Sequence, residues 1–256
     1  MTATIMMVTY NRLDLTKETL DYIWKNTKYP FHLAIVDNGS TDGTVEFLKE
    51  EIEKKPAGLR LDGPQEFFVE SAIQYNAENK GIAPGRNQAL KLAEKWSDPW
   101  LSTFDNDVYV PDGWLKEAIN IMTKNPQYGM IGVNMENVTY PMVNLNDQEF
   151  QEKPRGNLGT ACTVFPRSLH KMLGYFCKSF EFYGHEDADF GFRTRVLGLK
   201  LGYIKENGKH LGEGEQDKGA YREFKNKYGK ENLPKFHQNC SDYYNKKKSL
   251  YIPYKE

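Results

Sequence analysis

Residues 36–44 have the sequence VDNGSTDGT, and this stretch decides the fold class. It begins at the end of a strand-like run, His32 to Val36, and its glycines and aspartates are typical of a loop. The amphipathic stretch that follows, Thr44 to Glu53, predicts a helix. A strand, a loop and a helix in this order predict a unit of an α/β sheet, with Asp37 at the carboxyl end of its strand.

The same alternation continues on both sides of this unit. Ala3 to Thr9 predicts a strand and Leu13 to Trp24 a helix, while Arg86 to Trp96 predicts a helix and Trp100 to Phe104 a short buried strand. We therefore expect an α/β fold with a Rossmann-like, mixed but mostly parallel central sheet. In such sheets ligands bind at the carboxyl ends of the strands.

Other parts of the chain are less regular. Phe67 to Tyr75 mixes apolar and polar residues and indicates no particular element. A further helix is predicted from Pro111 to Met122, and the polar residues 134–154 predict irregular structure. From Gly159 onward, aromatic and charged clusters replace the alternation.

The composition excludes several classes of protein. Lys+Arg of 34 against Asp+Glu of 35 leaves a net charge of −1, so no general positive field favours nucleic acid or anionic lipid. Met1 to Val8 lacks the features of a signal peptide, and nothing approaches the roughly 20 apolar residues of a membrane span. Cys162, Cys177 and Cys240 are scattered and match neither a disulfide framework nor a zinc site.

We therefore expect a soluble, cytoplasmic protein. The lysines at 246–248, followed by residues 251–254 of sequence YIPY, allow peripheral contact with an anionic membrane surface. A solvated chain end is the more common reason for such a run.

Two carboxylates, Asp105 and Asp107, directly follow the predicted strand Trp100 to Phe104. Carboxylates two residues apart in a loop can converge on a hard cation. A divalent metal there could bridge a diphosphate and neutralise the negative charge that develops as the diphosphate leaves. The pattern is also common in solvated turns, so it needs support from other motifs.

Residues 184–189, GHEDAD, carry three carboxylates within four positions. Like charges this close raise one another's pKa and suit general-base chemistry. Acidic residues before the helical pattern Phe190 to Leu197 also favour the helix dipole, and we assign Asp189 to that structural role. Glu186 and Asp187 remain the chemical candidates.

His210 lies in a loop bracketed by glycines, where an imidazole could complete a metal site begun by a carboxylate. A lone histidine is more often a surface or packing residue. Residues 202–209 come close to a phosphate-binding loop but have the wrong spacing, and no Gly-x-Gly-x-x-Gly is present. Kinase and dehydrogenase functions therefore lose their main support.

Taken in order, these motifs resemble the inverting GT-A glycosyltransferases of family 2, from the first strand to about His210. Residues 8–12, VTYNR, resemble the family's first strand and base-binding turn, residues 36–44 its acidic second-strand motif, and residues 79–87, NKGIAPGRN, its glycine-rich stretch. Asp105-Asn106-Asp107 corresponds to its DxD motif. The resemblance implies these donor contacts: Thr9, Tyr10, Asn11, Arg12, Asp37, Asn79, Lys80, Gly81, Arg86, Asp105 and Asn106. For Arg86, a structural salt bridge is an equal alternative to an oxyanion contact.

Residues 184–189 are also similar to the Gly-Glu-Asp-Asp segment of galactosyltransferases and polypeptide N-acetylgalactosaminyltransferases. This similarity implies that Asp187 is the catalytic base and that Asp107 and His210 hold Mn²⁺ or Mg²⁺. Imidazole favours Mn²⁺. The acceptor side would comprise Trp114, Gly184, His185 and Glu186, and residues 159–161 would line both the donor-sugar and acceptor sides.

The implied protein is a single GT-A domain over residues 1–215, with a nucleotide-sugar half (1–110), an acceptor half (111–215) and a helical or irregular extension (216–256). It would transfer a sugar from a nucleotide diphosphate, with UDP the most common donor class, to a glycan, lipid-linked sugar or other hydroxyl acceptor. A sugar-phosphate nucleotidyltransferase would need a glycine-rich triphosphate loop, and Asn11 to Asp14 has none. A non-catalytic carbohydrate-binding protein has no need of these clustered carboxylates.

Overall fold

The computed structural model describes residues 1–54, 67–136, 138–180, 182–212 and 220–254. The elements of the first half are β1 (Ala3–Thr9), α1 (Leu13–Asn26), β2 (Phe31–Asp37), α2 (Thr44–Leu48), β3 (Phe68–Tyr75), α3 (Ile82–Leu92), β4 (Trp100–Asp105), β5 (Val108–Tyr109) and α4 (Trp114–Lys124). Those of the second half are β6 (Tyr128–Asn134), β7 (Met142–Leu145), β8 (Gln148–Lys153), β9 (Cys162–Pro166), α5 (Arg167–Leu173), α6 (Glu186–Val196), β10 (Lys200–Asn207), β11 (Lys209–His210) and α7 (Ala220–Tyr244).

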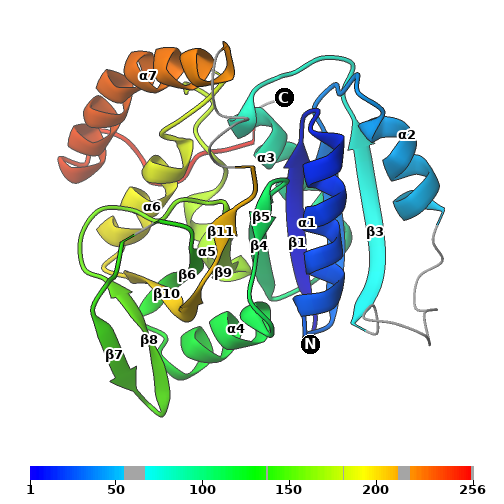
Figure 1. Cartoon of the computed structure of the whole chain (residues 1–256). Coiled ribbons are helices and arrows are strands. Elements are labelled where there is room, and N and C mark those ends of the chain that lie inside the picture. The colour runs from blue at the N-terminus through cyan, green and yellow to red at the C-terminus, as the bar shows by residue number, and fades with distance from the viewer. Residues whose placement is uncertain (55–66, 137, 181, 213–219, 255–256) are drawn as a thin grey trace.

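Within these described residues, one nine-stranded sheet has the order β3-β2-β1-β4-β9-β6-β10-β8-β7 (Figure 1). β1 pairs in parallel with β2 and β4, and β2 pairs in parallel with β3. β9 runs antiparallel between β4 and β6, and β8 runs antiparallel to β10. The other strands share one direction, which confirms the predicted mixed, mostly parallel sheet.

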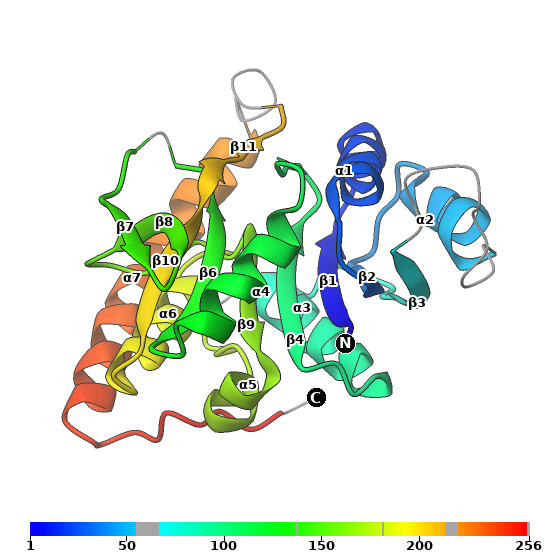
Figure 2. The same ribbon diagram turned by 90° about the horizontal axis from the view of Figure 1, so that it is seen from below.

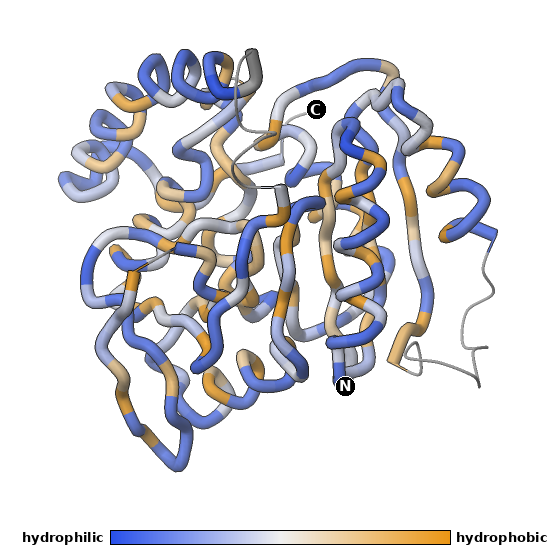
Figure 3. Tube along the Cα trace, viewed as in Figure 1, coloured by the Kyte–Doolittle hydropathy of each residue, from blue (hydrophilic) through white to orange (hydrophobic). Residues whose placement is uncertain are grey.

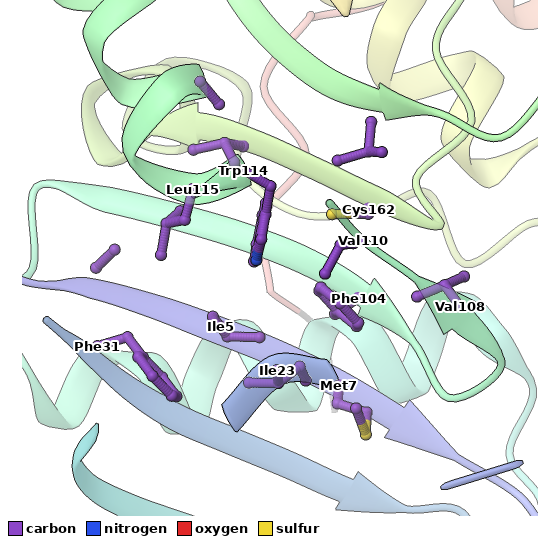
Figure 4. Close-up of a cluster of buried hydrophobic side chains, with 14 of the residues drawn as sticks. Ile5, Met7, Ile23, Phe31, Phe104, Val108, Val110, Trp114, Leu115 and Cys162 are labelled. Carbon is purple, nitrogen blue, oxygen red and sulfur yellow. The ribbon is translucent and has the colours of Figure 1, made fainter. Parts of the chain in front are cut away.

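Helices cover both faces of the sheet (Figure 2). Helices α1, α2 and α4 contribute to one apolar core, and α3, α5 and α6 contribute to the other. Alternate residues of β1 point to opposite faces, so that Ile5 and Met7 enter the first core and Met6 the second. Figure 4 shows part of the first core around Phe104. Because both faces are covered, all residues of β1 and β2 are buried.

Two segments differ from the expectation. Phe68–Tyr75, which indicated no element, is the edge strand β3, and only its first residue is fully buried. Residues 134–154, expected to be irregular, contain the antiparallel hairpin β7–β8. Its turn residues Asn146 and Asp147 have φ of 50° and 59°, the left-handed pair of a tight hairpin turn. The prediction failed because polar residues outnumber apolar ones in this hairpin, although Val143, Leu145 and Phe150 pack in the first core.

Several helix limits also shift. The stretch Thr44 to Glu53 is α2 followed by a π-helical turn, Lys49–Glu53. Helix α3 begins at Ile82 rather than at Arg86, because Pro84 lies in the first turn, where no N–H donor is needed. A 3₁₀ turn, Ala93–Lys95, continues this helix.

The long helix α7 lies over the end of α6 (Figure 1). It is largely hydrophilic compared with the strands (Figure 3) and contains Pro234. The side-chain amide of Asn239 on α7 donates a hydrogen bond of 3.1 Å to Asp189 on α6. After α7 the chain returns to the domain, where Ile252 pairs with Gly174. None of the helices in the described part of the chain is long and apolar enough to cross a membrane.

Candidate active site

A cleft of about 710 Å³ opens at the carboxyl ends of β1 and β4. It is bounded by the loops after these strands, the start of α3, the segment before β9, the start of α6, and residues after β11 and on α7. The predicted site residues that line it are Tyr10, Arg12, Asn79, Arg86, Asp105, Asn106, Asp107, Gly159, Thr160, Ala161, Gly184, Glu186, Asp187 and His210. The structure therefore brings together segments that are far apart in the sequence.

Arg86, on α3, connects three walls of this cleft from a buried position. Its guanidinium donates to Asp105 and Glu186, each at 3.0 Å, and to the hydroxyl of Thr160. Burial by itself would lower the pKa of Arg86, but the charges of Asp105 and Glu186 outweigh burial and raise it. Arg86 is therefore positively charged at any ordinary pH. Its ion pairs with Asp105 and Glu186 are the structural salt bridges that the sequence offered as an alternative to an oxyanion contact.

Asp107 and His210 meet because the short strand β11 pairs with β5, placing His210 opposite Val108. The imidazole Nδ1 lies 3.5 Å from one carboxylate oxygen of Asp107, and Arg12 donates to the other at 2.6 Å. Burial raises the pKa of Asp107, but hydrogen bonding to His210 and the charges of His210 and Arg12 outweigh it and hold that pKa below its ordinary value. Asp107 is therefore an anion at neutral pH.

These two side chains fit a divalent cation. Two ligands at about 2.1 Å from a metal, at right angles or slightly wider, are separated by roughly 3.0–3.4 Å, close to the observed distance between Asp107 and His210. No group of three potential metal-ligating side chains occurs among the described residues. A metal held here would therefore take its other ligands from a diphosphate and water, as Mg²⁺ commonly does.

Glu186 and Asp187 begin α6, after His185 in a left-handed backbone conformation. Asp187 lines the cleft, and one of its oxygens accepts a 2.6 Å hydrogen bond from the backbone N–H of Ala188. Glu186 is buried, and within the described part of the chain its Oε2 has no hydrogen-bond partner. Burial, with a smaller contribution from Asp187, raises the pKa of Glu186 to about 7.

The other end of the cleft is built by the loop after β2. Asp37 is buried, and its Oδ1 accepts hydrogen bonds from the backbone N–H groups of Gly39 and Ser40 at 3.1 and 2.9 Å. Among the described residues its Oδ2 has no partner. Asn38, which the sequence analysis did not select, lines the cleft and donates to Asn79 at 2.9 Å. An unsatisfied buried acceptor is costly, so Asp37 Oδ2 is a candidate partner for a donor group, although Asp37 itself does not line the cleft.

The model of the family "Glycosyl transferase family 2" matches residues 4–180, more than half of the chain. The chain belongs to this family. The matched segment contains the Asp37 loop, Arg86 and both aspartates of the Asp105-Asn106-Asp107 motif. No curated protein matches it.

Solved structures share the GT-A fold of this chain. A mannosyltransferase from Pyrobaculum calidifontis, in complex with GDP-Man and Mn²⁺, is 20% identical with a TM-score of 0.58, over 80% of this chain and 54% of that one. S. aureus TarS 1-349, in complex with UDP-GlcNAc, is 18% identical with a TM-score of 0.61, over 87% of this chain and 61% of that one. The chain therefore spans little more than half the length of these structures.

Three of the predicted contact residues have side chains that do not line the cleft. Trp114 is fully buried in the first core and donates to Thr27 at 3.1 Å, so it cannot contact an acceptor (Figure 4). Thr9 is also fully buried, and its hydroxyl accepts from Asn106 at 3.0 Å. The ring of His185 stacks on Phe236 of α7, with centroids 5.6 Å apart, and turns away from the cleft.

Four other predicted donor contacts do not line the cleft: Asn11, Asp37, Lys80 and Gly81. Asn11 accepts from the backbone N–H of Thr41 at 2.8 Å, so its side chain ties the first loop to the second. Gly81 has φ of 88°, and a Cβ there would lie 2.9 Å from the Cα of Phe182. Asp189 has the predicted structural role, since it is fully buried and pairs with Arg193 at 2.8 Å.

The contribution of α7 to the cleft was not predicted from the sequence. Phe224 and Lys225, near the start of this helix, line the cleft together with Phe182 and Tyr183. Positive charge from Lys225 also contributes to the lowered pKa of Asp107. The only available signal was the aromatic and basic composition of residues 221–228, which has no fixed spacing from the motifs.

The raised pKa of Glu186 predicts a pH-dependent stability for the metal-free protein. A carboxyl with a folded-state pKa of about 7 and an ordinary value of 4.5 binds more protons in the folded state between these values. The free energy of unfolding therefore falls as pH rises through this window. We expect Glu186→Gln to remove this component, so that the variant's unfolding midpoint declines less than that of the wild type between about pH 5 and pH 8. Parallel curves of unfolding midpoint against pH would contradict the prediction.

Proposed function

We propose that this glycosyltransferase moves a sugar from a nucleotide diphosphate to an acceptor hydroxyl, with inversion and with a divalent metal. The observation that carries the proposal is the presence of the Asp107–His210 pair and the Asp187 carboxylate in one cleft of about 710 Å³. The first can hold the cation that neutralises a leaving diphosphate, and the second would serve as a base in the same cleft. The nucleotidyltransferase and binding-only alternatives have no comparable support.

The donor would lie along the floor of the cleft. We assign the nucleoside to the loop after β2, where the open oxygen of Asp37 can accept a hydrogen bond and the half-exposed ring of Tyr10 can stack against a base. Arg12, which already contacts Asp107, supplies positive charge beside the diphosphate. UDP is the proposed donor class, and the UDP-GlcNAc complex of the structurally similar TarS supports it.

The metal would be held by Asp107 and His210, and when bound it would supply charge neutralisation to the departing diphosphate. An imidazole ligand favours Mn²⁺ over Mg²⁺. The Mn²⁺ in the complex of the similar mannosyltransferase supports this assignment. Asp105, fixed by Arg86, would face the ribose or the donor sugar.

Asp187 would act as the general base. Its carboxylate takes the proton of the acceptor hydroxyl while that oxygen forms a bond to the anomeric carbon, and the bonding pair of the old glycosidic bond leaves with the diphosphate. A single displacement of this kind inverts the anomeric configuration. Glu186, held by Arg86 next to Asp187, would contact a neighbouring hydroxyl of the acceptor.

We also propose the predicted division into a nucleotide-sugar half, residues 1–110, and an acceptor half, residues 111–215. The segment 216–256 would complete the acceptor half, since Phe224 and Lys225 belong to the cleft wall. Arg86 joins the two halves through Glu186.

Ligand-dependent thermal unfolding tests the proposal. UDP, GDP and their sugars, each with and without Mn²⁺, are added to the purified protein and the unfolding midpoint is measured. A ligand at 100 times its Kd stabilises by about 2.7 kcal/mol, which raises the midpoint by about 5–10 °C for a domain of this size. We expect one nucleotide class to stabilise the protein, and only when Mn²⁺ is present. Absence of stabilisation by every nucleotide would overturn the proposed donor site.

A further inference from the structure

Aromatic rings from two elements meet on the acceptor side of the cleft. Phe182 and Tyr183 precede α6, and Phe224 and Tyr228 lie on α7. The ring centroid of Phe182 is 5.1 Å from that of Tyr228 and 6.4 Å from that of Phe224, which is itself 4.8 Å from Tyr228. Phe182, Phe224 and Tyr228 therefore form one continuous group, which we call the aromatic wall.

Phe182 is held in the aromatic wall by a costly backbone conformation. Its φ is 52°, in the left-handed region, which is uncommon for a bulky side chain and costs on the order of 1–3 kcal/mol. Its carbonyl accepts a 3.0 Å hydrogen bond from the N–H of Ile82, and its backbone packs against Gly81. The ring nevertheless remains 42% exposed and lines the cleft. A strained backbone conformation that does not serve to bury its side chain is typical of a functional position.

Helix α7 is fixed relative to the catalytic segment by three hydrogen bonds. Asn232 donates to the carbonyl of Tyr183 at 3.0 Å, and the imidazole of His185 lies 2.9 Å from the carbonyl of Gly229. Asn239 donates to Asp189 at 3.1 Å. The segment 182–189, which contains Asp187, and the helix that carries Phe224 therefore form one unit. The aromatic wall has a set position next to the proposed base.

We propose that the aromatic wall binds the ring of a carbohydrate acceptor, and this inference rests on the proposed function. A pyranose presents an apolar C–H face, which suits the electron-rich face of an aromatic ring, and hydroxyls around its edge. Here the rings of Phe182 and Phe224 and the carboxylates of Glu186 and Asp187 line the same cleft. A sugar ring on the aromatic wall would direct an edge hydroxyl to Asp187.

The same observations disfavour other acceptors. A lipid chain would remove water from Asp187 without offering hydrogen bonds in return, which is costly for a carboxylate. A nucleobase could stack on the wall, but the open hydrogen-bond acceptor for a base is Asp37, in the loop after β2. The combination of aromatic faces and hydroxyl-accepting carboxylates is best matched by a saccharide.

Saturation-transfer NMR with methyl glycosides of glucose, galactose and N-acetylglucosamine tests this inference on the full chain, with UDP, GDP and diamagnetic Mg²⁺ present. We expect signal transfer to the ring C–H protons of at least one glycoside. Phe224→Ala should raise the Kd of that glycoside about tenfold, since an aromatic contact contributes up to about 1.4 kcal/mol. Phe224→Trp should retain binding. Tyr244→Ala is the matched control, because Tyr244 is on the same helix but 77% exposed and outside the cleft.

A second variant distinguishes loss of binding from loss of folding. Phe182→Asn removes the ring but keeps a residue that tolerates the left-handed backbone, so it should lose glycoside binding while its unfolding midpoint remains near that of the wild type. Binding of no glycoside, or equal binding by wild type and Phe224→Ala, would overturn the inference. So would a Phe224→Ala protein that loses nucleotide binding instead. Manganese-dependent nucleotide stabilisation is measured on the same protein preparations, and its failure would count against the proposed function alone.

Discussion

Replacing Asp187 by asparagine is expected to lower kcat by about a hundredfold to ten-thousandfold, the range typical of a lost general base. The amide has nearly the same shape as the carboxylate but cannot take the proton of the acceptor hydroxyl. Asp187 lines the cleft, and we propose it for the acceptor side, so the affinity for the nucleotide with Mn²⁺ should remain that of the wild type. Steady-state rates at saturating donor and nucleotide titrations measure the two effects separately.

Asp189→Asn provides the matched control for this experiment. Asp189 lies two residues further along α6, but it is fully buried and pairs with Arg193 at 2.8 Å. Removing one partner of such a pair should cost a few kcal/mol of unfolding free energy and leave the remaining folded enzyme active. Full turnover by Asp187→Asn would refute its assignment as the base. Loss of nucleotide binding would place Asp187 in the donor site.

Replacing Asp107 by asparagine is expected to lower activity by roughly a hundredfold to a thousandfold, because the metal contributes several kcal/mol of charge stabilisation. Asp107 is the anion beside His210, and an amide binds a hard cation far less well. The concentration of Mn²⁺ that gives half-maximal activity should increase as the maximal activity falls. Metal titrations of activity measure both quantities.

His210→Ala should produce a loss of the same kind, and the double variant should be little worse than either single variant, because both residues would hold the same ion. Asp112→Asn is the control, since this carboxylate is exposed and only weakly paired, with Lys28 at 3.6 Å. An unchanged Mn²⁺ midpoint in Asp107→Asn would contradict the assigned metal site. Additive losses would show that Asp107 and His210 act independently.

The sheet of the first half could be predicted because its strands are covered on both faces. β1 and β2 are buried throughout and therefore appear as continuous apolar runs, each followed by a loop and a helix. The edge strand β3 and the exposed hairpin β7–β8 lack such runs, since water contacts one or both of their faces. The antiparallel strand β9 was missed as well, because its pairing with β4 and β6 depends on residues distant in the chain.

The residues of the candidate site likewise fall into those that a local sequence pattern predicts and those that depend on tertiary contacts. Asp105 and Asp107 were found because they end a recognisable strand, and Asp187 because its motif is local. The approach of His210 to Asp107 follows from the pairing of β11 with β5, which no local pattern indicates, and the resemblance to a known family supplied it. Trp114 was misplaced because an aromatic residue that opens a helix can face either a core or a ligand. Phe224 was missed because the position of α7 is set by tertiary contacts.

The contacts of Arg86 also bear on how the enzyme acquires activity as it folds. Its partners Asp105, Thr160 and Glu186 lie 19, 74 and 100 residues further along the chain. Contacts with such large separations form late, because the loops between them must close first. A nascent or partly folded chain would therefore have an assembled β1–β2 region and still lack a competent cleft. Donor binding should appear only with the last kinetic phase of refolding, and bound nucleotide should slow the first step of unfolding.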